Sequence, residues 1–133
     1  MDNNIEKFKL EKIKIKDISQ HSVESWDIKL VDEDDRHVYV SASIGQITNI
    51  LFGMSKIKDI SKINSIYQVF DLFIKNNNQK IKSVIIDSVD EAFSTSKIEI
   101  EKDKNLAYFD IETGDAISLA LINDIPIYTL NYL

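Results

Sequence analysis

GDAISLALINDIPIY, residues 114–128, is the stretch that decides the fold. Thr113 is a good N-cap for a helix over Asp115–Ile122, because its hydroxyl can accept a hydrogen bond from a free backbone N–H of the first turn. Pro126 cannot continue a helix, so the chain should turn at the Asn-Asp pair and enter a strand at Ile127. The helix side chains expected to be buried against a sheet are Ile117, Ala120 and Leu121.

The residues upstream of this helix predict further strands. The run Ile81–Ile86 is almost wholly apolar, as in a central strand that is covered on both faces, and a turn is expected over Asp87–Glu91. Two alternating segments, Phe93–Ile100 and Leu106–Ile111, flank the polar residues Glu101–Asn105. This arrangement predicts a hairpin that feeds directly into the terminal helix.

The N-terminal third also alternates apolar and polar residues. Phe8–Ile15 does so with a phase slip between Leu10 and Ile13, which predicts either one strand with a bulge or two separate segments. Trp26–Leu30 and Val38–Ala42 alternate on either side of a polar turn at Asp32–Asp35. They predict a second hairpin.

Two helices are expected in the middle of the chain. Ser43-Ile-Gly-Gln46 matches a capping box and should start a helix that carries Ile44 through Met54, with Gly53 as its stop. A second helical pattern runs over Ile63–Lys75 and ends at Asn76–Asn78, and its aromatic stripe is expected in the core. The sequence therefore predicts one α+β domain over residues 1–133, a mixed, largely antiparallel sheet with two central helices and a C-terminal helix packed on it.

Composition narrows the class of protein. The chain has 133 residues, of which 44% are hydrophobic and 29% charged, as in an ordinary globular domain. It contains no cysteine, which excludes disulfides, thiolate nucleophiles and cysteine metal sites. Residues 1–16 lack the unbroken apolar run of a secretion signal, and no segment is apolar enough to span a membrane. We expect a cytoplasmic protein with no membrane association.

Charge bears on nucleic-acid binding. Twenty-two acidic against sixteen basic residues give a formal charge of −6, which repels a phosphate backbone. The lysines cluster over 7–16 and 75–82, where solvated faces are the more common explanation. His21 and His37 have no metal-binding spacing and are expected at the surface.

Several of these stretches resemble the bifunctional nuclease family. Residues 114–128 resemble its terminal helix and the Ala-Pro-Ile-Tyr that follows, and Asp110 and Asp115 match its two aspartates around an Arg-Pro-Ser segment, here Glu112-Thr-Gly114. The family's Pro-Leu-Thr-His-Asp motif corresponds to residues 64–68, which read NSIYQ. Its Gly-Pro-Ser-Glu motif corresponds to residues 41–44, which read SASI. The resemblance implies an α+β fold, self-association and nuclease action on DNA and RNA.

The resemblance also implies a candidate site. Asp110 and Asp115 could act as catalytic residues by holding Mg²⁺ or Mn²⁺, which would neutralise the scissile phosphate and activate water. A local alternative is that Asp115 only stabilises the helix N-terminus. Glu112 replaces a phosphate-binding arginine, and residues 64–68 lack the family's His and Asp. The acidic residues Asp87, Asp90 and Glu91 could bind a cation, but an acidic turn is usually just solvated.

Two functions follow from these observations. One is a divergent family member that is weak or inactive as a nuclease and serves as a self-associating or protein-binding module. The alternative is an active metal-dependent nuclease that uses Asp110 and Asp115. The helix over Ser43–Met54 is apolar around more of its circumference than one sheet face can cover, which predicts a homodimer.

Overall fold

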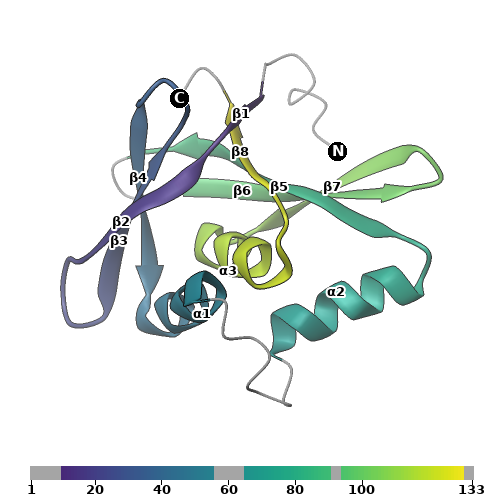
Figure 1. The fold of residues 1–133 in the computed structure, drawn as a ribbon, viewed down its shortest axis with the longest axis horizontal. Coiled ribbons are helices and arrows are strands. Elements are labelled where there is room, and N and C mark those ends of the chain that lie inside the picture. The colour runs from purple at the N-terminus through teal and green to yellow at the C-terminus, as the bar shows by residue number, and fades with distance from the viewer. Residues whose placement is uncertain (1–9, 56–64, 91–93, 131–133) are drawn as a thin grey trace.

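The computed structural model describes residues 10–55, 65–90 and 94–130, and in these ranges the chain forms an α+β fold (Figure 1). Three helices accompany a mixed five-stranded sheet and an antiparallel three-stranded sheet. The predicted fold class is confirmed. Phe8, Ile63 and Phe93, where three predicted elements begin, lie outside the described residues.

The five-stranded sheet is built around β5 and has the order β1-β8-β5-β6-β7. Its strands are β1 (Leu10–Lys12), β5 (Lys80–Val89), β6 (Ser94–Lys102), β7 (Asn105–Ile111) and β8 (Ile127–Leu130). Neighbours are antiparallel except β5 and β8, which run parallel. Val84, Ile85 and Ile86 have no exposed surface, which confirms the buried central strand. The turn predicted from Asp87 is wrong there, because pairing with β6 continues through Val89 opposite Ser94.

The three-stranded sheet contains β2 (Lys14–Gln20), β3 (Ser25–Val31) and β4 (His37–Ser43), so the hairpin predicted from Trp26–Leu30 and Val38–Ala42 is confirmed. The phase slip after Leu10 marks a change of sheet: β1 pairs with β8 and β2 with β3. Ile13 lies between the two strands, where its side chain is buried and its N–H donates to the carbonyl of Ile127 over 3.0 Å. The alternative of two separate segments is therefore the correct one.

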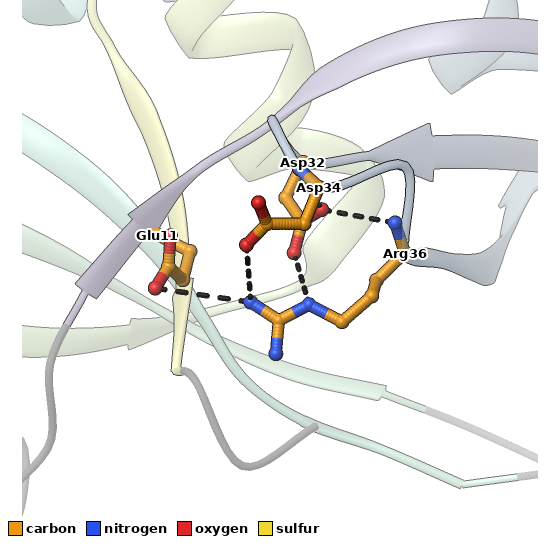
Figure 2. A network of polar contacts seen from close by, with 4 residues as sticks. All are labelled: Glu11, Asp32, Asp34 and Arg36. Carbon is orange, nitrogen blue, oxygen red and sulfur yellow. Dashed lines mark hydrogen bonds and ion pairs between the residues drawn. The ribbon is translucent and has the colours of Figure 1, made fainter.

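Arg36, the single arginine of the sequence, ties the β3–β4 turn to the five-stranded sheet (Figure 2). Its Nε donates to Asp32 over 2.8 Å, and its Nη2 lies 3.6 Å from Asp34 and 3.8 Å from Glu11 of β1. Desolvation would raise the pKa of Asp32, but hydrogen bonds from the backbone N–H groups of Arg36 and Asp34, together with the guanidinium, outweigh it and lower that pKa. The turn is thus held by one cation among three carboxylates.

Helix α1 (Ile44–Ser55) begins with the predicted capping box. The Ser43 hydroxyl accepts from the N–H of Gln46 over 3.2 Å, and the Gln46 side-chain oxygen accepts from the N–H of Ser43 over 3.0 Å. Ile47 and Ile50 are buried. Gly53 does not end the helix, contrary to the prediction, but lies inside it and faces Leu121 at close range.

Helix α2 (Ile66–Asn76) starts at its own capping box, formed by Ser65 and Gln68. Tyr67 and Phe70 pack against the core as expected for the aromatic stripe. Phe73, however, is 62% exposed, so its predicted core position is wrong. The helix rests on α3 and β5 through its other face.

Helix α3 (Thr113–Asn123) is enclosed on nearly all sides. Its N-cap is Glu112, and Thr113 instead makes hydroxyl hydrogen bonds to Ser94 (2.8 Å) and Ser96 (2.7 Å), so the predicted Thr113 cap is wrong. The helix ends at Asp124, which adopts the left-handed conformation. Ile117 and Ala120 are buried as predicted, whereas Leu121 is only partly buried.

One hydrophobic cluster joins both sheets and all three helices. It includes Ile28 and Val40 of the smaller sheet, Ile50 of α1, Val84 of β5 and Ile117 of α3. Within the described ranges, no helix has the length and apolar character needed to cross a membrane.

Candidate functional site at the helix N-termini

The starts of α1 and α2 each contact the start of α3, and the polar motifs of the resemblance correspond to stretches at these helix starts. Gln46, in the first turn of α1, donates from Nε2 to Oε2 of Glu112 over 3.1 Å. Tyr67, in the first turn of α2, donates its hydroxyl hydrogen to Oδ1 of Asp115 over 2.8 Å. We call Gln46, Tyr67, Glu112, Asp115 and Ser118 the N-terminal cluster.

The Gln46 amide serves two helices at once. Its oxygen caps α1 at the N–H of Ser43, and its nitrogen reaches Glu112, the N-cap residue of α3. This position exists only because residue 114 is glycine, since a β-carbon on Gly114 would overlap the Gln46 amide. The Glu112-Thr-Gly114 segment is thus fitted to Gln46 by shape as well as by hydrogen bonding.

Asp115 and Tyr67 form the second half of the cluster. Burial, the hydrogen bond to Asp115 and the negative charges of Asp115 and Glu112 raise the pKa of Tyr67 to about 12, against a weaker lowering by the Ser118 hydroxyl. Ser118 is fully buried and donates back to the carbonyl of Gly114 over 2.8 Å. Tyr67 therefore stays a neutral donor at physiological pH and holds the Asp115 carboxylate in place.

Asp110, the other predicted site residue, has different partners. It lies in β7 with 87% of its side chain exposed, and its Oδ1 accepts from Nζ of Lys97 over 2.5 Å. Lys97 also lies 3.3 Å from Asp87. The hydrogen bond to Asp110, followed by the carboxylate of Asp87, raises the pKa of Lys97 despite partial burial. Asp110 and Asp115 share no hydrogen-bond partner among the described residues.

The remaining sequence candidates lie at the surface or in other contacts. His21 is 70% exposed and lies 3.6 Å from Asp27, and His37 packs edge-on against Tyr39 with ring centroids 5.6 Å apart. The described lysines of the two clusters are exposed, as predicted: Lys12, Lys14, Lys16, Lys75, Lys80 and Lys82. In the part of the chain that the structure describes, no three His, Asp or Glu side chains are grouped so as to hold a metal ion.

Two large hollows of the described surface lie away from the N-terminal cluster. One of about 670 Å³ is lined by Lys12–Lys16 and by residues at and just after the end of β3. One of about 850 Å³ is lined by Lys12–Ile15, Gly53, Met54, Ala120, Leu121 and residues 124–128. Neither is lined by any member of the cluster. The cluster is accordingly a set of contacts between helices. Neither of the two substrate-sized hollows opens onto it.

Sequence reasoning missed Tyr67 and the second contact of Gln46. The Ser65-Ile-Tyr-Gln68 capping box was a readable signal, because it fixes the start of α2 and so brings Tyr67 into the first turn. The Gln46–Glu112 contact joins residues 66 positions apart and had no local signal.

This geometry defines the class of protein as an α+β domain with three helices and a parallel β5–β8 strand pair. The starts of its helices meet at α3. Residues 28–133 match the family profile described as the bifunctional nuclease domain, so the chain belongs to that family. A search of curated proteins found no match.

Proposed function

We propose that this chain is a divergent bifunctional nuclease domain that is weak or inactive as a nuclease and acts as a self-associating or protein-binding module. The observation that carries the proposal is the state of the Glu112 and Asp115 carboxylates. Each accepts a hydrogen bond from a neutral donor on another helix, Gln46 or Tyr67, and within the described residues neither forms an ion pair.

Phosphodiester cleavage makes demands that this cluster does not meet. A cation must neutralise the phosphate, and a base or a metal-bound water must attack it. Glu112 stands where the family resemblance places an arginine, and a carboxylate repels a phosphate. Tyr67 has a pKa of about 12, so it cannot act as a base near neutral pH. The net charge of −6 further weakens nucleic-acid binding.

Asp110 and Asp115 would have to leave their present partners to bind a metal together. Asp110 would give up Lys97, and Asp115 would give up Tyr67, the link between α2 and α3. Family membership favours the alternative of an active nuclease that uses these two aspartates with Mg²⁺ or Mn²⁺. The hydrogen bonds favour a structural role for Asp115.

The binding role rests on apolar surface that the fold leaves uncovered. On α1, Ile44 is 57% and Leu51 51% exposed, although Ile47 and Ile50 of the same helix are buried. Exposed apolar side chains on a helix are a common feature of association surfaces. A homodimer in the cytoplasm is the proposed state.

The experiment is a cleavage assay on single-stranded DNA, duplex DNA and RNA, with Mg²⁺ or Mn²⁺, for wild type and the Asp110→Asn and Asp115→Asn variants. Protein prepared identically from an empty expression host measures contaminating nuclease. We expect wild type to cleave no faster than this control. Metal-dependent cleavage that disappears in both variants would establish the alternative function.

A further inference from the structure

The outward face of α2 is apolar, although it faces solvent. Ile66 is 72%, Val69 45%, Leu72 48% and Phe73 62% exposed. Ile66, Val69 and Phe73 follow helical spacing at i, i+3 and i+7, so they form one stripe, with Leu72 beside it. We call these four side chains the α2 stripe.

Helix α2 is apolar on its exposed face as well as on its buried face, which carries Tyr67, Phe70 and Ile74. Its acidic residue, Asp71, is buried at 6% exposure and pairs with Lys75 over 2.8 Å. These are the only charged residues of the helix, and α1 contains none at all. Three exposed large apolar side chains on α1 and four on α2 make seven of the ten found on the described surface. An exposed apolar face without free charge is typical of a surface that another protein covers.

We propose that the α2 stripe is the contact by which two copies of this chain pair, with the two α2 helices antiparallel across a two-fold axis. This proposal rests on the self-association proposed above and names its surface. Ile66 and Phe73 lie two helical turns apart, so the antiparallel arrangement sets Ile66 of one copy opposite Phe73 of the other. Val69 and Leu72 fill the space near the axis.

Charge favours a second copy as the occupant. Two chains that each carry −6 repel one another least when they meet through a face without net charge. The only exposed charge of α2, Lys75, is neutralised by Asp71 of the same helix. The stripe offers no free cation to a phosphate backbone or an anionic membrane. α1 and α2 both pack on α3 at the same side of the five-stranded sheet (Figure 1), so the neutral face is broader than one helix.

The first test substitutes one residue of the stripe and, as matched controls, two residues of similar exposure elsewhere. Phe73→Glu introduces a carboxylate at an exposed position, where folding should survive. Leu51→Glu on α1 (51% exposed) and Phe109→Glu on β7 (52% exposed) introduce the same charge at similar exposure elsewhere. By sedimentation equilibrium, we expect Phe73→Glu to raise the dimer dissociation constant at least about tenfold, because each new carboxylate would be buried without a partner against the apolar Ile66 of the other copy. Phe109→Glu should leave it unchanged.

A second test uses the absence of cysteine from the chain. Val69→Cys should form a disulfide-linked dimer under mild oxidation, because a residue near the axis meets its own copy within bonding range. Leu51→Cys and Phe109→Cys should cross-link far more slowly. A circular dichroism spectrum identical to wild type confirms that each variant is folded.

The outcomes separate the two proposals. Wild type that remains monomeric at about 100 μM, far above the range in which stable dimers form, would overturn self-association and the surface together. A wild-type dimer that survives Phe73→Glu but dissociates in Leu51→Glu would overturn only the α2 contact and assign the interface to α1. A dimer that survives both substitutions would also overturn it.

Discussion

Tyr67 of α2 donates a hydrogen bond to Asp115 of α3 over 2.8 Å, joining two helix starts that are 48 residues apart in the chain. Asn123, at the other end of α3, donates to the backbone carbonyl of Tyr67 over 3.0 Å. The same tyrosine thus anchors α2 to both ends of α3. This explains how a helix with an exposed apolar face stays attached to the domain.

The Tyr67 contact should make the free energy of unfolding depend on pH in the alkaline range. The pKa of Tyr67 is about 12 in the folded chain against 10.0 for a free tyrosine, so the folded state keeps a proton that the unfolded state loses. The stabilisation is complete below pH about 10 and is lost as the pH rises toward about 12. Urea denaturation across this pH range should show that the free energy of unfolding falls more steeply with pH for wild type than for Tyr67→Phe. Lys97, whose pKa is also raised, contributes equally to both proteins. Parallel curves for the two would contradict the assignment.

Gly53 should not tolerate a side chain. A β-carbon there would lie 2.7 Å from Cβ of Leu121 and 3.0 Å from the backbone N of Ile122, and backbone atoms of a buried helix cannot move aside cheaply. We expect Gly53→Ala to lower the free energy of unfolding by about 1–3 kcal/mol, measured by urea denaturation.

Gly45 of the same helix is the matched control. A β-carbon on Gly45 would meet only Oγ of Ser43, at 3.9 Å. Alanine is the better helix former, so Gly45→Ala should be neutral or stabilising by up to about 1 kcal/mol. Equal losses in Gly45→Ala and Gly53→Ala would show that the α1–α3 contact is not the cause.

Gly114 and Gln46 should be energetically coupled. The three atoms nearest to a β-carbon on Gly114 all belong to the far end of the flexible Gln46 side chain, which can rotate away at the loss of its cap and of the Glu112 contact. Gly114→Ala should therefore cost about 0.5–2 kcal/mol, the usual value of a helix cap. In a Gln46→Ala background that cost should largely vanish. A double-mutant cycle measures the difference, and simple additivity would contradict the coupling.

Much of the fold could be predicted from local patterns. The two hairpins, the buried strand at Val84–Ile86 and the Ser43 capping box are properties of neighbouring residues, and each is present. The wrong predictions concern positions whose structure depends on contacts between segments that are distant in the sequence. The sequence pattern predicts that Gly53 ends the helix, whereas in the structure Gly53 is the point at which α3 approaches α1. The helical periodicity predicts that Phe73 is in the core, but it is exposed. Periodicity shows which residues lie on the same face of a helix and does not show whether that face is covered.

The candidate site was predictable in part for the same reason. Asp115 could be placed in the first turn of a helix from the sequence, and it lies there. Its partner could not be named, because the contact with Tyr67 depends on how α2 packs across α3. The Lys97–Asp110 pair likewise depends on the register between β6 and β7, which sets these residues opposite each other.

We propose that the carboxylates of the N-terminal cluster hold helices together and do not hold a metal. The most direct measurement is the free energy of unfolding of wild type with and without Mn²⁺ at matched ionic strength, with Asp115→Asn as the comparison. A metal at a hundred times its dissociation constant stabilises the state that binds it by about 2.7 kcal/mol. We expect Mn²⁺ to leave the free energy of unfolding of wild type unchanged, and Asp115→Asn to be less stable by about 1 kcal/mol with or without the metal. Stabilisation of wild type by Mn²⁺ that disappears in Asp115→Asn would contradict this proposal.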